Sequence, residues 1–196
     1  KGWFIDHVET FSERNLERIA ELGGGIALQN RLQFQAEDFA ALYGTEALGK
    51  TPNFRAILDL GVPVGGGTDA TRVTSYNPWF SIQWMSTGLS RGGMRMYGDD
   101  NLLTREEALR VWTTGSAWFT GDAGRKGAIT PGQLADFAVL DRDYFAVTDA
   151  EIAKLQSELT VLGGEVVHAK GSFAHLDLKH IPPISPDWSP VIFENG

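Results

Sequence analysis

The chain has 196 residues, of which 42% are hydrophobic and 21% charged, a balance typical of a globular protein with one sizeable core. Its 25 acidic and 17 basic residues give a net charge of −8, which disfavours nucleic acid and membrane surfaces as partners because both require a basic face. No run is long enough for a transmembrane helix, and the absence of cysteine excludes disulfides and fits a cytoplasmic location.

The chain begins inside an apolar run, without an initiator Met or a signal-peptide pattern. Residues 3–5 predict a buried strand that ends at Asp6 and His7. A chain that opens inside a strand is expected to be a piece of a longer protein. We therefore expect the upstream part of the same fold to be a partner of this segment.

Strands and helices alternate in the prediction for residues 1–70. Ser12 has N-cap chemistry for a helix that Gly23 ends, and residues 26–28 form a second strand. After a polar stretch, Thr51-Pro52 is expected to cap and open a second helix, and residues 62–64 form the third strand. This order predicts a parallel sheet with right-handed crossovers.

The next segment is expected to be helical at residues 77–88 and to form a glycine-rich loop at residues 90–100. Thr104 and Glu107 have the spacing of a capping box that opens another helix.

The pattern becomes β-rich from residue 127 onward, with a strand predicted at residues 137–140. Gly163-Gly164, between residues 159–162 and 165–168, is the strongest hairpin signal in the chain.

Two residues stand where a parallel α/β fold places its chemistry. His7 and Asp69 both follow the C-terminal ends of predicted strands, the edge at which α/β barrels build their active sites. Taken singly, each has a structural interpretation: a hydrogen-bonded histidine at a strand end, and an aspartate that caps a helix or forms a turn. Gly65-Gly66-Gly67 fits no phosphate-binding motif and is expected to let backbone segments approach closely.

Other polar and aromatic residues carry weaker hypotheses. Six lie in the loops after Asp69 and could line a substrate pocket or simply pack on its rim: Arg72, Tyr76, Trp79, Arg91, Arg95 and Tyr97. Three histidines have no ligand-like spacing and are expected at the surface or on an edge strand: His168, His175 and His180.

Several motifs, in order, resemble the YtcJ-like branch of the metal-dependent amidohydrolase superfamily. Ile5-Asp6-His7 with the helix after it resembles the sixth barrel strand of those enzymes, and GVPVGGGTDA at residues 61–70 resembles the eighth. Residues 103–117 are similar to the helix that precedes the return from the barrel. GAITPGQLADFAVLD at residues 127–141 is similar to that return, and residues 163–167 to the last hairpin of the small sandwich.

The resemblance covers residues 2–170 and implies an α/β fold. Its parts are the C-terminal part of a TIM (β/α)8 barrel over residues 1–125, β-sandwich strands over residues 126–172, and an irregular proline-rich tail over residues 173–196.

The family resemblance also implies a metal site. Enzymes of this superfamily hold one or two divalent metals, here expected to be zinc. Their ligands are a His-x-His pair, a bridging carboxylate or carboxylated lysine, two further histidines and an aspartate. Only His7 and Asp69 match these positions, and two ligands do not suffice for a catalytic zinc. The other ligands would lie upstream of Lys1.

The activity implied is hydrolysis of a non-peptide carbon–nitrogen bond in a small amide-type molecule. Metal-activated water would be the nucleophile, and Asp69 would be both ligand and catalytic base. The isolated segment is expected to be inactive, and a homo-oligomer is compatible with it. Two alternatives stay open: a non-catalytic β-rich interaction domain, and a degenerate barrel, in either of which His7 and Asp69 are structural.

Overall fold

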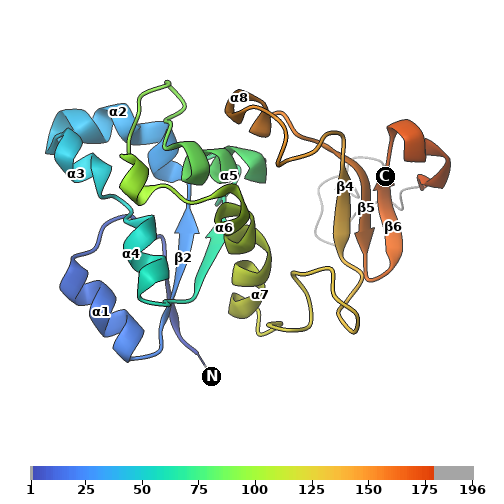
Figure 1. The fold of residues 1–196 in the computed structure, drawn as a ribbon, viewed down its shortest axis with the longest axis horizontal. Coiled ribbons are helices and arrows are strands. Elements are labelled where there is room, and N and C mark those ends of the chain that lie inside the picture. The colour runs from blue at the N-terminus through green and yellow to red at the C-terminus, as the bar shows by residue number, and fades with distance from the viewer. Residues whose placement is uncertain (1, 179–196) are drawn as a thin grey trace, which may run out of the picture.

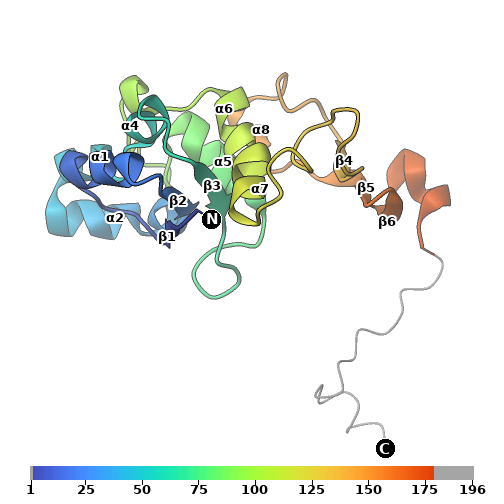
Figure 2. The ribbon, with the colours of Figure 1, turned by 90° about the horizontal axis from the view of Figure 1, so that it is seen from below.

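The computed structural model describes residues 2–178, which form two three-stranded sheets at opposite ends of the molecule (Figure 1, Figure 2). The first sheet is parallel, with strand order β1-β2-β3, and consists of Phe4–Asp6, Gly25–Gln29 and Val64–Gly67. The second is antiparallel, with strand order β4-β5-β6, and consists of Phe137–Leu140, Ser157–Leu162 and Glu165–Ala169. The chain is therefore an α/β protein with two separate sheets.

Helices connect the parallel strands and then lead to the second sheet. Between β1 and β3 lie α1 Glu13–Glu21, α2 Arg31–Tyr43, α3 Thr45–Gly49 and α4 Phe54–Asp59. After β3 come α5 Pro78–Thr87, the 3-10 helix η1 Asp99–Asn101, α6 Arg105–Arg110, the π-helix η2 Val111–Gly115 and α7 Ser116–Phe119. Beyond β4 are α8 Asp149–Ile152 and the 3-10 helix η3 Gly171–Leu176.

Local sequence signals explain where several helices begin and end. The Ser12 hydroxyl accepts a hydrogen bond from the Asn15 amide at the start of α1, and Gly23 follows its end with a φ of 68°. At α6, Thr104 and Glu107 form the expected capping box. These predictions are confirmed.

Two expectations about the first half of the chain are wrong. The strand β1 is not buried, because it lies at the edge of the sheet and pairs only with β2 within residues 2–178. Its Phe4 and Ile5 side chains are 44% and 41% exposed. The third strand covers Val64–Gly67 rather than residues 62–64, and it extends further than expected because the glycine run itself pairs with β2.

The polar stretch between the second and third strands folds into α2 and α3, which were not predicted. The buried face of α2 contains Leu32 and Ala36 but also Gln33, which interrupts the apolar pattern. Thr51 does not cap α4, because its hydroxyl donates to the Ala47 carbonyl at 2.6 Å. Asn53 caps that helix instead, accepting a hydrogen bond from the Ala56 amide at 3.0 Å.

The larger hydrophobic core lies between the parallel sheet and its helices and extends toward the second sheet. Its members include Ile26 and Leu28 of β2 and Trp84 of α5, all at most 4% exposed. The segment before β5 contributes Tyr144 and Ile152 to the same core. The connection from β4 to β5 therefore packs on α5 and α6.

Hydrogen bonds hold that connection in place. Arg105 of α6 donates to the Tyr144 carbonyl at 2.7 Å and pairs with Asp149 at 2.7 Å, and Gln83 of α5 donates to the Asp149 carbonyl at 2.7 Å. The predicted β5–β6 hairpin is confirmed, with Gly163 and Gly164 at φ values of 60° and 87° in its turn.

The last described helix is η3, so residues 173–176 are helical where an irregular tail was expected. The rest of that predicted tail, residues 179–196, lies outside the described part of the chain. Within residues 2–178, no helix has both the length and the apolar character needed to cross a bilayer.

Candidate active site

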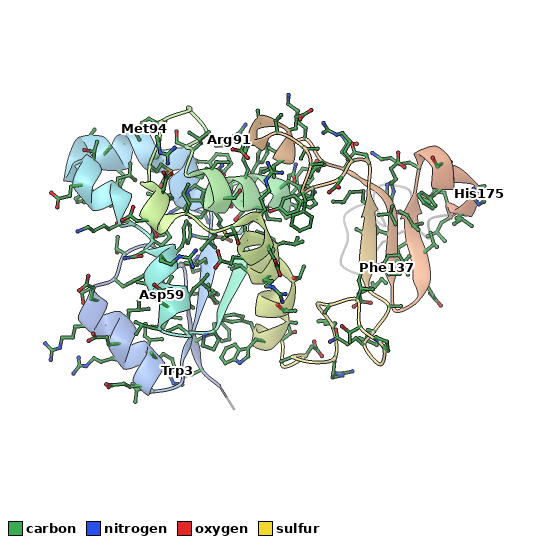
Figure 3. The ribbon with its side chains drawn as sticks, viewed as in Figure 1. Trp3, Asp59, Arg91, Met94, Phe137 and His175 are labelled. Atoms are coloured by element: carbon green, nitrogen blue, oxygen red, sulfur yellow. The ribbon has the colours of Figure 1, made fainter. Side chains whose placement is uncertain are left out.

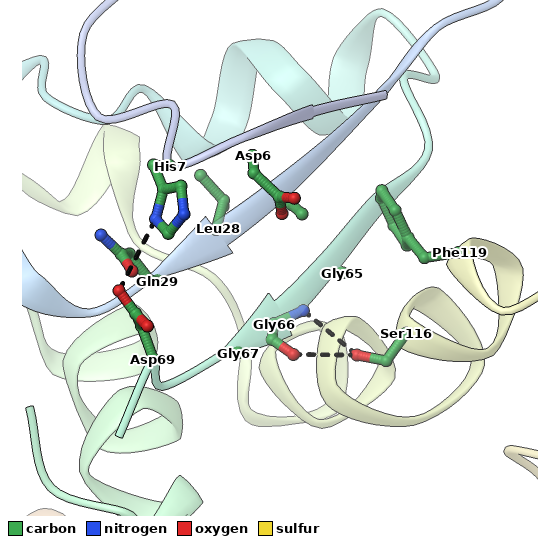
Figure 4. Close-up of a pocket in the computed structure, with 11 residues that line it drawn as sticks. Asp6, His7, Leu28, Gln29, Gly65, Gly66, Gly67, Asp69, Ser116 and Phe119 are labelled. Atoms are coloured by element: carbon green, nitrogen blue, oxygen red, sulfur yellow. Dashed lines mark hydrogen bonds and ion pairs between the residues drawn. The ribbon is translucent and has the colours of Figure 1, made fainter. Parts of the chain in front are cut away.

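The three parallel strands end at one edge of the sheet, and a pocket of about 330 Å³ opens there (Figure 4). His7 directly follows β1, Gln29 is the last residue of β2, and Asp69 lies two residues beyond β3. All three line the pocket. The parallel arrangement brings these residues together although 62 positions separate the first from the last in sequence.

His7 and Asp69 share an uncommon backbone conformation. Their φ angles are 60° and 51°, and they are the only non-glycine residues with positive φ within residues 2–178. Histidine and aspartate adopt this region more readily than most residues, but it remains strained, and such strain concentrates at functional sites. Because both backbones turn sharply after their strands, both side chains reach the same pocket.

The two side chains face each other across a short gap. His7 Nδ1 lies 3.9 Å from Asp69 Oδ2, and the side chains are 58% and 48% exposed (Figure 4). The distance is too long for a direct hydrogen bond. It is shorter than the sum of two zinc–ligand bonds of about 2.0–2.2 Å each, so one metal ion could contact both atoms.

Beside this pocket, an ion pair joins the loop after β1 to the first residue of α2. Arg31, the first residue of α2, donates to both carboxylate oxygens of Glu9, with distances of 3.0 Å from Nε and 2.6 Å from Nη2. The bond to Glu9 raises the pKa of the Arg31 guanidinium, and the negative charge of Asp69 adds to the effect. The pair therefore ties the loop that carries His7 to the start of α2 and places a positive charge near Asp69.

The glycine run of β3 allows helices to pack directly on that strand. A methyl group at Gly66 would lie 2.6 Å from the Trp112 ring of η2. The Ser116 hydroxyl accepts from the Gly66 amide at 3.2 Å and donates to the Gly66 carbonyl at 3.1 Å (Figure 4). This close approach is what the sequence predicted for the run.

Metal-binding groups in the pocket are few. Asp6 also lines it, but no set of three or more His, Cys, Asp or Glu side chains within residues 2–178 is grouped closely enough to hold a metal ion. An imidazole and a carboxylate are donors that suit zinc. The described residues thus fit part of a zinc site, and further ligands would have to come from elsewhere.

None of the six loop residues proposed as pocket residues lines this pocket. Tyr97 is 2% exposed in the core and donates to the Thr51 carbonyl at 2.9 Å, and burial raises its pKa well above the usual value. Arg91 lies over the Phe80 ring, 4.0 Å from its centre. These contacts support the packing interpretation for both residues.

Trp79 borders a different and larger hollow of about 960 Å³, between helices α5 to α7 and strand β4. Its lining is mainly aromatic and aliphatic, and His7 and Asp69 are not part of it. The larger hollow is therefore distinct from the site at the strand ends.

The two other described histidines lie away from the pocket, as expected. His168 is an exposed residue of β6, and His175 is an exposed residue of η3 at the far end of the molecule from the parallel sheet (Figure 3). His180 lies outside the described residues. Gln29 was not predicted as a site residue, although it stands at the end of a parallel strand, as His7 and Asp69 do.

Comparison with known proteins supports the sequence resemblance. Residues 1–168 match the amidohydrolase family. Amidohydrolase YtcJ of Bacillus subtilis is 28% identical over 171 residues, which are 84% of this chain and 31% of that protein. N-substituted formamide deformylase of Arthrobacter pascens is 32% identical over 110 residues, 56% of this chain and 20% of that protein.

The fold has counterparts among solved structures. Atrazine chlorohydrolase TrzN from Arthrobacter aurescens TC1, solved with zinc, superposes with a TM-score of 0.61 at 23% identity, over 85% of this chain and 36% of that one. The fold is of the α/β class, and its pocket lies at the ends of the parallel strands. This chain belongs to the amidohydrolase family. It spans about a third of the length of the first relative it matches.

Proposed function

We propose that the chain is the C-terminal part of a metal-dependent hydrolase that cleaves non-peptide carbon–nitrogen bonds in small amide-type molecules. The observation that carries the proposal is the convergence of His7 and Asp69, 3.9 Å apart, in one pocket at the ends of two parallel strands. Membership of the amidohydrolase family supports the type of bond, as does the name of the formamide deformylase relative.

In this proposal, residues 1–125 supply the closing strands and helices of a (β/α)8 barrel, and residues 126–172 supply part of a small β-sandwich. The parallel β1-β2-β3 sheet, with helices between its strands, is consistent with a barrel segment. The separate antiparallel sheet is consistent with the second unit. The open edge at β1 is where an upstream barrel strand would pair.

His7 and Asp69 would hold a divalent metal, most simply zinc, together with ligands from the upstream part of the barrel. When bound, the metal supplies Lewis-acid polarisation of the substrate carbonyl and lowers the pKa of water. Zinc in the TrzN structure supports the choice of metal. A cytoplasmic location is consistent with the absence of cysteine.

The protein side chains carry the proton transfers. Asp69 has a carboxylate that is half exposed to the pocket and can accept a proton from the attacking water. The same carboxyl group would then give that proton to the leaving nitrogen, which needs it to depart as a neutral amine. His7 would contribute an imidazole nitrogen as a metal ligand.

The test uses the full-length protein that contains this segment. We expect it to bind zinc, to hydrolyse members of a panel of N-acyl amines and cyclic amides, and to lose turnover with a chelator. Asp69→Asn should lower turnover by about 100-fold or more, because an amide cannot take up the proton. The melting temperature should hold, since asparagine tolerates the positive φ of 51° at this position.

Asp59→Asn is the matched control, because Asp59 is an exposed residue at the end of α4, outside the pocket. It should retain native turnover. Near-native turnover of Asp69→Asn would remove Asp69 from the proposed catalytic role. A full-length protein that neither binds zinc nor hydrolyses the panel would instead be a degenerate barrel in which His7 and Asp69 are structural.

A further inference from the structure

Gln29 occupies the central position of the strand-end edge. Because β2 pairs with β1 on one side and with β3 on the other, its last residue lies between the strand that leads to His7 and the strand that leads to Asp69. The Gln29 side chain is drawn beside the His7–Asp69 pair in Figure 4. A residue here can reach the same small molecule as both of them.

Strand alternation turns the Gln29 side chain toward the pocket. Ile26 and Leu28 of β2 enter the hydrophobic core, and Ala27 and Gln29 lie on the opposite side of the strand. Ala27 and Gln29 line the pocket, which Leu28 also borders, and the residue paired with Gln29 on β3 is Gly67, which has no side chain to fill the space. Gln29 therefore borders the pocket with two small neighbours, Ala27 and Gly67.

The side-chain oxygen of Gln29 is buried without a hydrogen-bond partner within residues 2–178. The residue is 6% exposed, and its Oε1 atom has no partner within residues 2–178. Two other buried side-chain atoms in that range share this condition, Asn30 Oδ1 and Trp84 Nε1, but neither residue lines the pocket. Buried amide groups are nearly always paired, so an unpaired one in a pocket points to a ligand that supplies the partner.

We infer that Gln29 is a substrate-binding residue whose carboxamide hydrogen-bonds the carbon–nitrogen group of the substrate. A carboxamide offers one acceptor and one donor group, and a half-turn of its last torsion exchanges their positions. An amide substrate presents the complementary pair, a carbonyl oxygen and an N–H group. The inference rests on the proposed function: Gln29 would bind the amide group of the substrate, and Asp69 would protonate its leaving nitrogen.

The experiment compares Gln29→Met with Gln83→Met in the full-length protein. Methionine keeps the length of glutamine and removes both hydrogen-bonding groups. Gln83 is a buried carboxamide on α5, outside the pocket, and it donates to the Asp149 carbonyl. Binding of N-butylformamide and N-benzylacetamide is measured by ligand-observed NMR, together with the melting temperature and the zinc content.

For Gln29→Met we expect binding of both probes to weaken about tenfold, the equivalent of one or two neutral hydrogen bonds. The zinc content should match that of the wild type, and the melting temperature should not fall, because no protein partner is lost. Gln83→Met should bind the probes as the wild type does and melt at a lower temperature. If Gln29→Met does not fold, Gln29→Asn withdraws the carboxamide by one methylene and should weaken binding to a similar extent.

Three results would overturn the inference: wild-type affinity in the Gln29 variant, a fall in its melting temperature equal to that of Gln83→Met, or no binding of either probe to the wild type. Turnover is scored separately on the N-acyl amine panel. A protein that binds the probes through Gln29 but hydrolyses nothing would contradict the proposed function and leave Gln29 as the amide-binding residue.

Discussion

Among single residues, some ion pairs join segments that are distant in sequence. Arg55 of α4 and Glu107 of α6 are the clearest example. Two guanidinium nitrogens of Arg55 each donate to Glu107 at 2.9 Å, and one also donates to the Leu102 carbonyl at 3.0 Å. The Arg55 bonds, with those from Thr104, lower the pKa of Glu107 from its usual 4.5 to about 2. The capping-box glutamate therefore also ties two helices together.

We expect Arg55→Met to destabilise the protein by about 1 kcal/mol at pH 7, the upper end for a partly exposed pair because the contact is bidentate. The folded-state pKa of Glu107 is depressed, so the pair stabilises the fold above pH 4.5. That contribution should disappear as the pH falls toward 2. Urea unfolding of wild type and variant at pH 7, 4.5 and 2.5 measures it.

Arg110→Met is the control for this pair, because Arg110 and Glu106 form an i,i+4 pair whose side chains are 64% and 65% exposed. Its cost should stay below about 0.5 kcal/mol at each pH. A cost of Arg55→Met that does not change with pH would show that the lost stability comes from packing of the arginine stem rather than from the carboxylate of Glu107.

At the scale of elements, the contact between β3 and the helical segment η2–α7 shapes one wall of the site. Gly115 ends η2 with helical φ and ψ angles of −61° and −52°, and a methyl group there would lie 2.2 Å from the Val64 carbonyl oxygen. On β3, a methyl group at Gly66 would lie 2.6 Å from the Trp112 ring. The strand and the helix therefore approach each other through glycines on both sides.

We expect Gly115→Ala to destabilise the protein by about 1–3 kcal/mol, because the new methyl group meets rigid backbone. Helix propensity alone predicts the opposite sign, since alanine is the better helix former. Gly49→Ala in α3 is the control, as its nearest contact would be an ordinary 3.6 Å from the Met96 carbonyl oxygen. Urea unfolding should show that the control is as stable as the wild type or more so. Equal stability of the Gly115 variant would contradict the close contact.

Helices and hairpins were predicted correctly where their boundaries depend on neighbouring residues, and the helix α2, whose burial depends on distant contacts, was missed. The Ser12 cap, the Thr104–Glu107 capping box and the Gly163-Gly164 hairpin each depend on residues within a few positions of one another. The helix α2 was missed because its buried face includes Gln33, whose carboxamide is paired inside the fold with Asn30 at 3.1 Å. Burial of a paired polar side chain cannot be read from an apolar pattern.

At the scale of the whole molecule, the parallel sheet leaves an apolar edge strand in contact with solvent. Trp3, Phe4 and Ile5 are 40–44% exposed, and β1 pairs with one neighbour only within the described chain. Trp3 marks the N-terminal end of this sheet in Figure 3. An edge strand that has a free side and exposed apolar side chains is prone to pair with another copy of the chain. The molecule is therefore expected to need a covering segment or a partner at this edge.

We expect the chain of residues 1–196, produced alone, to self-associate in a concentration-dependent way, measured by analytical ultracentrifugation. Ile5→Lys should reduce association, because a charge on an edge strand opposes pairing. Leu42→Lys is the control. Leu42 is more exposed, at 76%, but lies on α2, where the backbone hydrogen bonds are already made. A monomeric wild-type chain with a cooperative thermal transition would contradict the expectation.

Short-range patterns and position relative to a strand end were enough to predict the alternation of strands and helices, the resemblance to the amidohydrolase family and the two candidate residues His7 and Asp69. Three features are seen only in the folded chain: the side chains of His7 and Asp69 lie 3.9 Å apart, the residue between their strands is Gln29 with an unpaired side-chain oxygen, and β1 is exposed. Each of these depends on which strands become neighbours, and that pairing joins residues too distant in the chain for local patterns to record.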